Sequence, residues 1–257
     1  MISTRPTGKR LLVTGAAGGI GTAVVEHLLG EGCTVAACDL SFANWRLATQ
    51  PGVSTYAFDN ASWDATGTAI AEACIALESC DGLVINAGLV DTIHRSWSFG
   101  RIDWERDIGL NLTGAFRAAQ VAFPYLELGG NASVVFVASV AAEVGQPGQV
   151  AYSASKAGMI GMMRTLALEW GPKGIRCNAV MPGLVETPKV KQLPPSVRDR
   201  YMAQIPIARF GEPAELAATI AFLLSDGAAY INGATLRVDG GLGLNMIALT
   251  DGAGRSS

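Results

Sequence analysis

The amino-acid sequence predicts an α/β fold: a doubly wound, mostly parallel sheet of about seven strands with helices on both faces. Two observations predict it. Short apolar runs alternate with longer segments of helical periodicity along the chain, and such alternation implies right-handed crossovers between parallel strands. The composition is 49% hydrophobic and only 16% charged, which suits strands that helices cover on both faces. We therefore predict a single domain over residues 1–257.

The first strand is expected at 11–13, before a glycine-rich turn and a helix that begins near Ile20 and stops at Gly30. The remaining elements, in chain order, are strands at 34–38, 54–58, 82–85, 133–138, 175–181 and 234–238, and helices at 63–77, 104–126, 152–170 and 213–224. Two segments, about 89–103 and 184–206, read as long loops. Loops of this length are usually functional, and both follow the carboxyl ends of strands, where open sheets bind ligands.

Residues 242–257 are expected to form a C-terminal tail. Its apolar part, 242–249, is predicted either to pack on a neighbouring subunit or the active-site mouth, or to be partly ordered, with disorder from Asp251 onward.

Composition excludes several classes of function. The net charge is −3 and no basic stripe is present, so no nucleic-acid partner is expected. No apolar run reaches the ~18 residues of a membrane helix, and the first ten residues lack a signal peptide's apolar core. The five cysteines are odd in number and lack metal-ligand spacing, which favours reduced thiols in a cytoplasmic protein and no metal site.

The turn at residues 14–21 has the spacing of a dinucleotide-binding turn. Gly15 permits the tight turn, Gly19 lets the backbone approach a pyrophosphate, and Gly21 allows close packing of helix on strand. The following helix offers free N–H groups and the positive end of its dipole to phosphate. Because a strand precedes the turn and a helix follows it, the sequence predicts a nucleotide site.

Asp39 ends the second strand, 18 residues after Gly21. A carboxylate there can accept the ribose hydroxyls of the adenosine half and would repel a 2′-phosphate. No Arg or Lys occurs at 16–19 or 40–45, and the first cation beyond the strand is Arg46. The sequence therefore favours NAD over NADP.

Tyr152 and Lys156 are spaced to lie one turn apart on one helical face. A tyrosine of ordinary pKa, about 10, is a poor base at neutral pH. A nearby ammonium favours the phenolate and lowers that pKa, so the pair is a candidate acid/base.

Further motifs accompany this pair in a fixed order. They are Thr14-Gly15, Gly19-Ile20-Gly21, Asn86-Ala87-Gly88, Asn111, Ser139, Pro182-Gly183, Thr187, Arg209-Phe210-Gly211-Glu212-Pro213 and Val238-Asp239-Gly240-Gly241. With them the sequence resembles the short-chain dehydrogenase/reductase family from Thr14 to Gly241, nearly end to end. The resemblance implies a Rossmann-like fold and oxidoreductase activity.

The resemblance also implies roles for the matched residues. Tyr152 would accept the proton in alcohol oxidation, Ser139 would orient the substrate oxygen, and Asn111 would hold a water that links Lys156 to solvent. Lys156 would hold the nicotinamide ribose and lower the pKa of Tyr152. The implied cofactor-binding residues are Gly15, Gly18, Gly19, Ile20, Asp39, Asp59, Asn60, Asn86, Ala87, Gly88, Tyr152, Lys156, Pro182, Gly183, Val185 and Thr187.

The substrate walls are expected from 89–98, 140–149 and 184–201. Their polar candidates are His94, Arg95, Glu143, Gln146 and Gln149. This mixture favours NAD-dependent oxidation of a secondary alcohol such as a polyol, sugar or hydroxy acid. Open alternatives are a 3-oxoacyl-thioester or other carbonyl reductase, a dehydrogenase of hydrophobic cyclic or aryl alcohols, and a non-catalytic NAD-binding regulator. By resemblance, a homotetramer or dimer would assemble through the helices at 104–126 and 152–170.

Overall fold

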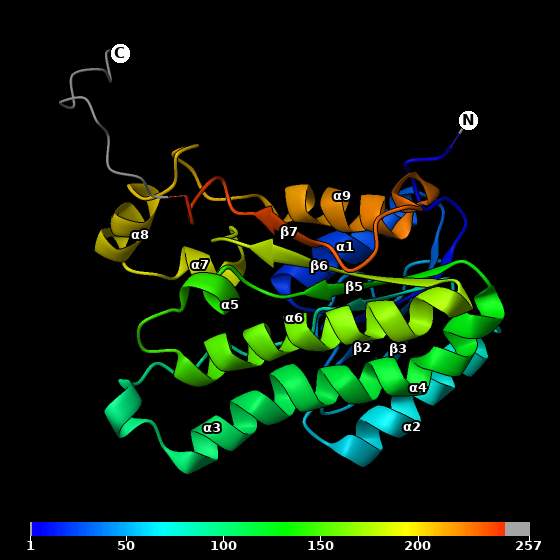
Figure 1. Cartoon of the computed structure of the whole chain (residues 1–257), viewed down its shortest axis with the longest axis horizontal. Coiled ribbons are helices and arrows are strands. Elements are labelled where there is room, and N and C mark those ends of the chain that lie inside the picture. Colours follow the sequence, from blue (N-terminus) through cyan, green and yellow to red (C-terminus); the bar gives the residue numbers. More distant parts are fainter. Residues whose placement is uncertain (1, 245–257) are drawn as a thin grey trace.

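The computed structural model describes residues 2–244 and is built on one seven-stranded sheet (Figure 1). The strands are β1 (Arg10–Thr14), β2 (Thr34–Asp39), β3 (Val53–Ala57), β4 (Gly82–Ile85), β5 (Ala132–Val137), β6 (Ile175–Pro182) and β7 (Thr235–Val238). Their order is β3-β2-β1-β4-β5-β6-β7, and every neighbouring pair is parallel. The predicted doubly wound sheet is confirmed.

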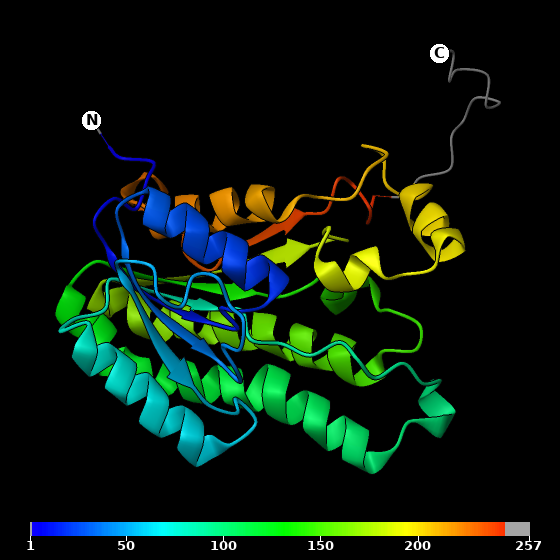
Figure 2. The same cartoon turned by 180° about the vertical axis from the view of Figure 1, so that it is seen from behind.

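Helices cover both faces of the sheet (Figures 1 and 2). The long ones are α1 (Gly19–Gly30), α2 (Trp63–Ala76), α4 (Gly114–Gly129), α6 (Val150–Trp170) and α9 (Pro213–Leu224). One core joins the sheet to α1 and α9, and includes Leu28 and Ile220. The other joins it to α2, α4 and α6, and includes Ile70, Leu126 and Met163. Two apolar faces explain why the five inner strands are buried almost throughout, whereas the edge strands β3 and β7 stay partly exposed.

The sheet reverses its winding between β1 and β4. From β1 the chain runs outward through β2 and β3, then returns to place β4 on the other side of β1. The carboxyl ends of β1 and β4 therefore diverge into a crevice, which is where open α/β sheets bind ligands.

The helix predicted at 104–126 differs from expectation. It begins earlier, as α3 (Arg101–Ile108), passes through a π-helical turn (Gly109–Thr113) and continues as α4. A π-turn widens the backbone by one residue and frequently marks a functional position. Here it contains Asn111.

The two predicted loops contain short helices. A single 3₁₀ turn (Ser96–Ser98) interrupts the first, and α7 (Pro188–Lys191) and α8 (Pro195–Met202) occupy much of the second. Each α-helix has proline in its first turn, where the missing N–H is not needed. A fourth short helix, α5 (Ala141–Val144), follows β5.

The predictions for 245–249 and for disorder beyond Asp251 lie outside the described residues. Over residues 2–244, every helix is too short or too polar to cross a bilayer. The five cysteines are free and buried.

Candidate active site

A cleft of about 440 Å³ opens at the carboxyl ends of β1, β2 and β4. It brings together predicted cofactor residues from four separate segments. They are Gly15, Gly18, Gly19, Ile20, Asp39, Asp59, Asn60, Asn86, Ala87 and Gly88. This grouping is the crevice expected at the reversal of strand order.

The glycine-rich turn fits a dinucleotide phosphate. Gly15 has a φ of +65°, and a Cβ there would lie 2.7 Å from the Cα of Ala87. A Cβ on Gly19 would lie 2.8 Å from the Cβ of Thr187. Gly18 caps α1 without a side-chain hydrogen bond, so the first N–H groups of the helix are available to an anion. The residues present therefore fit the cofactor that the fold implies.

Asn86 and Thr14 fasten this turn to the end of β4. The Asn86 amide donates to the backbone oxygens of Gly15 at 2.8 Å and Thr14 at 3.2 Å. The Thr14 hydroxyl accepts from the backbone N–H groups of Asn86 and Ala87, both at 3.1 Å. We had not singled out Thr14 as a site residue, although its place in the matched Thr14-Gly15 motif was a signal.

Asp39 lies on the cleft wall and braces the turn. Its carboxylate accepts the N–H of Ala17 at 2.8 Å and that of Leu40 at 2.7 Å. The described lining includes Asp39 and Asp59 but neither Arg nor Lys. Arg46, the first cation beyond β2, forms an ion pair with Glu26 instead.

Asp59 and Asn60, two further predicted cofactor residues, make different contacts. Asp59 accepts the N–H of Ala61 at 2.9 Å and remains at the cleft. Asn60 is buried and donates to the backbone oxygen of Leu110 at 2.9 Å. Its side chain therefore secures the π-turn itself.

Tyr152 and Ser139 meet where β5 and α6 converge. Ser139 follows β5, and Tyr152 lies in the first turn of α6. The Ser139 hydroxyl forms a side-chain hydrogen bond with the phenol, which lowers the pKa of Tyr152, but burial has the larger effect and raises it. The two side chains that the resemblance assigns to the substrate oxygen are therefore in contact.

Lys156 lies one turn along α6 from Tyr152. Its Nζ is 5.8 Å from the centroid of the Tyr152 ring and donates to the backbone oxygen of Val137 at 2.8 Å. Burial lowers the pKa of Lys156 to about 8. The hydrogen bond from Ser139 is the influence that lowers the pKa of Tyr152 here, and the Lys156 ammonium donates to Val137. The expectation that Lys156 lowers the pKa of Tyr152 stays a prediction.

Asn111 grips the loop after β4. Its Oδ1 accepts the N–H of Leu89 at 2.7 Å and its Nδ2 donates to the Leu89 oxygen at 2.9 Å. A Cβ on Gly88 would lie 3.2 Å from Nζ of Lys156 and 3.3 Å from Oδ1 of Asn111. Gly88 thus lets both side chains approach the chain where the two halves of the site meet. The water-holding role of Asn111 stays a prediction.

The remaining predicted cofactor residues, Pro182, Gly183, Val185 and Thr187, lie at the end of β6 and on the segment after it. Pro182 and Val185 are buried, and a Cβ on Gly183 would lie 3.0 Å from Asp239. Thr187 reaches the phosphate turn at Gly19 and caps α7 by accepting the N–H of Val190 at 3.4 Å. Of the four, Thr187 is the one whose side chain contacts the turn.

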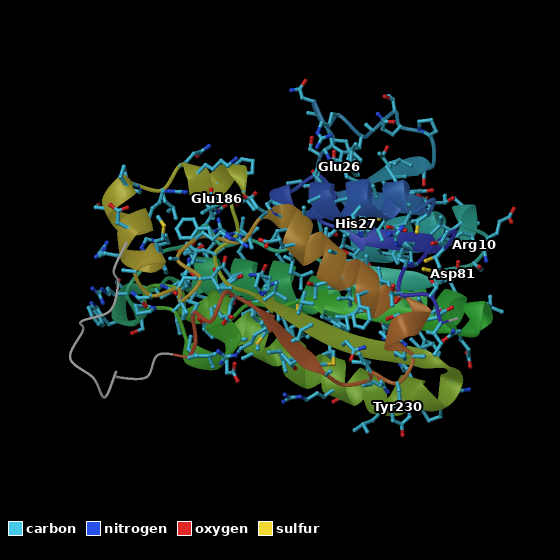
Figure 3. The ribbon with its side chains drawn as sticks, turned by 90° about the horizontal axis from the view of Figure 1, so that it is seen from above. Arg10, Glu26, His27, Asp81, Glu186 and Tyr230 are labelled. Atoms are coloured by element: carbon cyan, nitrogen blue, oxygen red, sulfur yellow. The ribbon has the colours of Figure 1, made fainter. Side chains whose placement is uncertain are left out.

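Ion pairs that sequence reasoning missed fix this segment over the site. The Arg198 guanidinium pairs with Glu186 and lies 4.7 Å from the ring centroid of Phe210. Lys189 pairs with Asp91 in the loop after β4. Figure 3 shows Glu186 in the part of the molecule that carries α7 and α8. These partners are far apart in sequence, and no local pattern marks them.

A second cleft, of about 880 Å³, is lined in part by Val140, which directly follows Ser139. All three predicted walls contribute to it, with residues from 93–95, 140–148 and 197–204, together with Leu242 and Gly243. Gln146 donates to the Tyr201 hydroxyl at 2.9 Å across the cleft. The expectation that Glu143 lines the substrate cleft is wrong. Glu143 pairs with Arg237 of β7 and lies outside the lining. Gln149 precedes α6 and also lies outside the lining.

Comparisons with known proteins agree with this geometry. A family model described as enoyl-(acyl carrier protein) reductase matches residues 15–243. The 3-oxoacyl-[acyl-carrier-protein] reductase FabG of Thermotoga maritima is 40% identical over 93% of this chain and 99% of its own. The (3R)-3-hydroxyacyl-CoA dehydrogenase of Mus musculus is 36% identical over 90% and 95%.

A solved structure, that of a putative short-chain alcohol dehydrogenase from Sinorhizobium meliloti 1021, has a TM-score of 0.87 at 31% identity. The match covers 95% of this chain and 99% of that one. Sequence motifs, sheet order, site geometry and relatives all lead to one assignment: this chain belongs to the short-chain dehydrogenase/reductase family of oxidoreductases.

Proposed function

We propose that this protein interconverts 3-oxoacyl and 3-hydroxyacyl thioesters, with NAD(H) preferred over NADP(H). The observation that carries the proposal is the contact between Tyr152 and Ser139. Ser139 directly precedes Val140 of the 880 Å³ cleft, and Lys156, one turn from Tyr152, approaches Gly88 of the glycine-lined cleft. The two relatives described above act, by their names, on 3-oxoacyl and 3-hydroxyacyl thioesters. These relatives favour the carbonyl-reductase alternative. They do not support the oxidation of a polyol, sugar or hydroxy acid.

The bound nicotinamide would supply or accept the hydride. The Tyr152 phenol is placed to donate a proton to the ketone oxygen during reduction and to take it back during oxidation. The Ser139 hydroxyl, which is hydrogen-bonded to the phenol, would be the second donor to that oxygen. Because burial raises the pKa of Tyr152, the phenol stays protonated at neutral pH, which suits the reductive direction.

Lys156 supports this chemistry from the same helix. Its ammonium is buried beside Gly88, at the loop that joins the two clefts. A buried donor there suits a hydroxyl of the nicotinamide ribose. Holding cofactor and substrate in one fixed geometry supplies much of the rate enhancement.

The preference for NAD(H) rests on charge. Asp39 and Asp59 line the adenosine end of the cleft, and the described lining contains no cation to balance a 2′-phosphate. Arg46, the first basic residue after β2, is paired with Glu26, so its charge is already balanced. A 2′-phosphate placed here would meet net negative charge.

The direct test is a steady-state assay of 3-oxobutyryl-CoA reduction with NADH and with NADPH. We expect turnover that is faster with NADH and is lost in Tyr152→Phe. Parallel reactions with NAD and polyols, sugars, hydroxy acids and cyclic alcohols test the other substrate classes. Preferential turnover of any of these over the thioester would overturn the proposal.

We further propose that the protein is cytoplasmic and assembles as a homotetramer, or a dimer, through the helices that include α4 and α6. Large apolar side chains are exposed on this side, including Phe116 of α4 and Leu168 of α6. Free buried cysteines are consistent with a reducing compartment. Light scattering on the purified protein tests the assembly, and a monomeric mass at micromolar concentration would contradict it.

A further inference from the structure

The 880 Å³ cleft beside Ser139 has an unusual balance of charge. Its described lining contains Arg95 and Arg200, together with His94, and contains no Asp or Glu. The whole chain carries a net charge of −3, so a carboxylate-free cleft is a local departure from the surface as a whole. Such a site raises the local concentration of anions.

The charges of both guanidinium groups are not balanced by a carboxylate among the described residues. Over residues 2–244, neither Arg95 nor Arg200 forms an ion pair, whereas Arg198 of the same helix α8 pairs with Glu186. Arg95 lies 5.8 Å from the ring centroid of the exposed Trp97, and Nε of Arg200 donates to the backbone oxygen of Ser196 at 3.3 Å. These contacts orient the two side chains without neutralising them.

The arginines come from opposite walls of the cleft. Arg95 belongs to the segment after β4, and Arg200 to α8. In Figure 1 these segments lie at the same end of the molecule, on either side of the stretch between α5 and α6. Val140 in the lining directly follows Ser139, so the cleft that holds both arginines also reaches the chain next to Ser139. Its inner wall is largely uncharged, with Val140, Val144 and Gln146.

This layout suits a long substrate whose reacting end is neutral and whose far end is anionic. We propose that Arg95 and Arg200 bind a phosphate ester on the carrier arm of the thioester, while the acyl end reaches Ser139 and Tyr152. The inference rests on the proposed function for the identity of the acyl end. The shared chemistry is a phosphorylated pantetheine arm, which coenzyme A and an acyl carrier protein both supply. Arginine matches phosphate oxygens with paired N–H donors.

The test compares thioesters with one acyl group and different arms. The 3-oxobutyryl thioesters of coenzyme A, of 4′-phosphopantetheine and of neutral N-acetylcysteamine are assayed at saturating NADH. For Arg95→Gln and Arg200→Gln we expect the KM of the phosphorylated thioesters to rise about fivefold to tenfold each, with kcat within about twofold. The KM of the N-acetylcysteamine thioester should not change. Arg5→Gln, at an exposed arginine outside the cleft, is the matched control for loss of one charge.

The two phosphorylated thioesters distinguish the possible sources. Equal losses on both would place the pantetheine phosphate at the arginines, and a loss on coenzyme A alone would place its nucleotide phosphates there. The first result supports the proposal. The second result, equal changes on neutral and phosphorylated thioesters, or no change on any, would each overturn it.

A binding measurement separates this inference from the proposed function. Calorimetry of 3-hydroxybutyryl-CoA on the NADH-saturated protein should show an affinity that falls in the double variant and weakens with added salt. If no thioester is turned over but this binding depends on the arginines, the proposed function fails and the anion site stands. If the wild-type protein does not bind the thioester, the anion site fails.

Discussion

The Nζ atom of Lys156 donates a hydrogen bond of 2.8 Å to the backbone oxygen of Val137, on the strand that ends just before Ser139. The ammonium is thereby tied to the sheet while its carbon chain crosses a buried region between α6 and β5. Burial lowers the pKa of Lys156 to about 8 from an ordinary value of 10.5. The charge is therefore kept for function at a cost in stability.

The pH dependence of stability should reveal that cost. Because the pKa of Lys156 is lower in the folded than in the unfolded protein, protonating it reduces the unfolding free energy. This reduction is absent above pH 10.5, grows as the pH falls toward 8, and stays at about 3 kcal/mol below pH 8. Lys156→Met removes this dependence. The unfolding free energy of the variant minus that of the wild type should fall by about 2 kcal/mol between pH 7 and pH 10. Urea titrations without cofactor measure it, and a difference that does not change with pH would contradict a buried charge.

Tyr152→Phe should remove the acid/base while leaving the packing of α6 intact. Loss of a general acid typically lowers kcat by about 10²–10⁴-fold. NADH affinity, measured by fluorescence, should stay nearly unchanged because the glycine-rich turn and Asp39 are untouched. Tyr201→Phe is the matched control, since Tyr201 borders the same cleft and bonds to Gln146. Retained turnover in Tyr152→Phe would show that another group moves the proton.

Asn111→Leu should damage both stability and catalysis. It removes two hydrogen bonds to Leu89 and leaves that residue's partly buried N–H and C=O groups unpaired, at a cost of about 1–2 kcal/mol in unfolding free energy. Asn111→Asp keeps the acceptor for the Leu89 N–H and loses the donor. It should retain more activity than the leucine variant near neutral pH. Equal unfolding midpoints for wild type and Asn111→Leu would show that the π-turn does not hold the loop.

Much of the candidate site could be predicted from sequence patterns that span only a few residues. Gly15, Asp39, Tyr152 and Lys156 were predictable because each occupies a fixed offset from the end of a strand or along a helix. The π-turn at Asn111 was not, since α and π turns use the same residues and only packing selects between them. The pairing of Glu143 with Arg237 joins residues 94 positions apart, which a single sequence does not reveal.

Asp39→Asn is the sharpest test of cofactor choice. The amide keeps an oxygen that can accept the Ala17 N–H, which Asp39 now accepts at 2.8 Å, so the turn should hold its shape. The negative charge that opposes a 2′-phosphate is lost. We expect the ratio of kcat/KM for NADH to that for NADPH to fall about tenfold, chiefly through a lower KM for NADPH. Asp59→Asn, at the other carboxylate of the cleft, is the comparison and should move the ratio less. If the ratio is unchanged in Asp39→Asn, the charge of Asp39 does not select the cofactor, and the absence of a cation along the described lining must account for any preference.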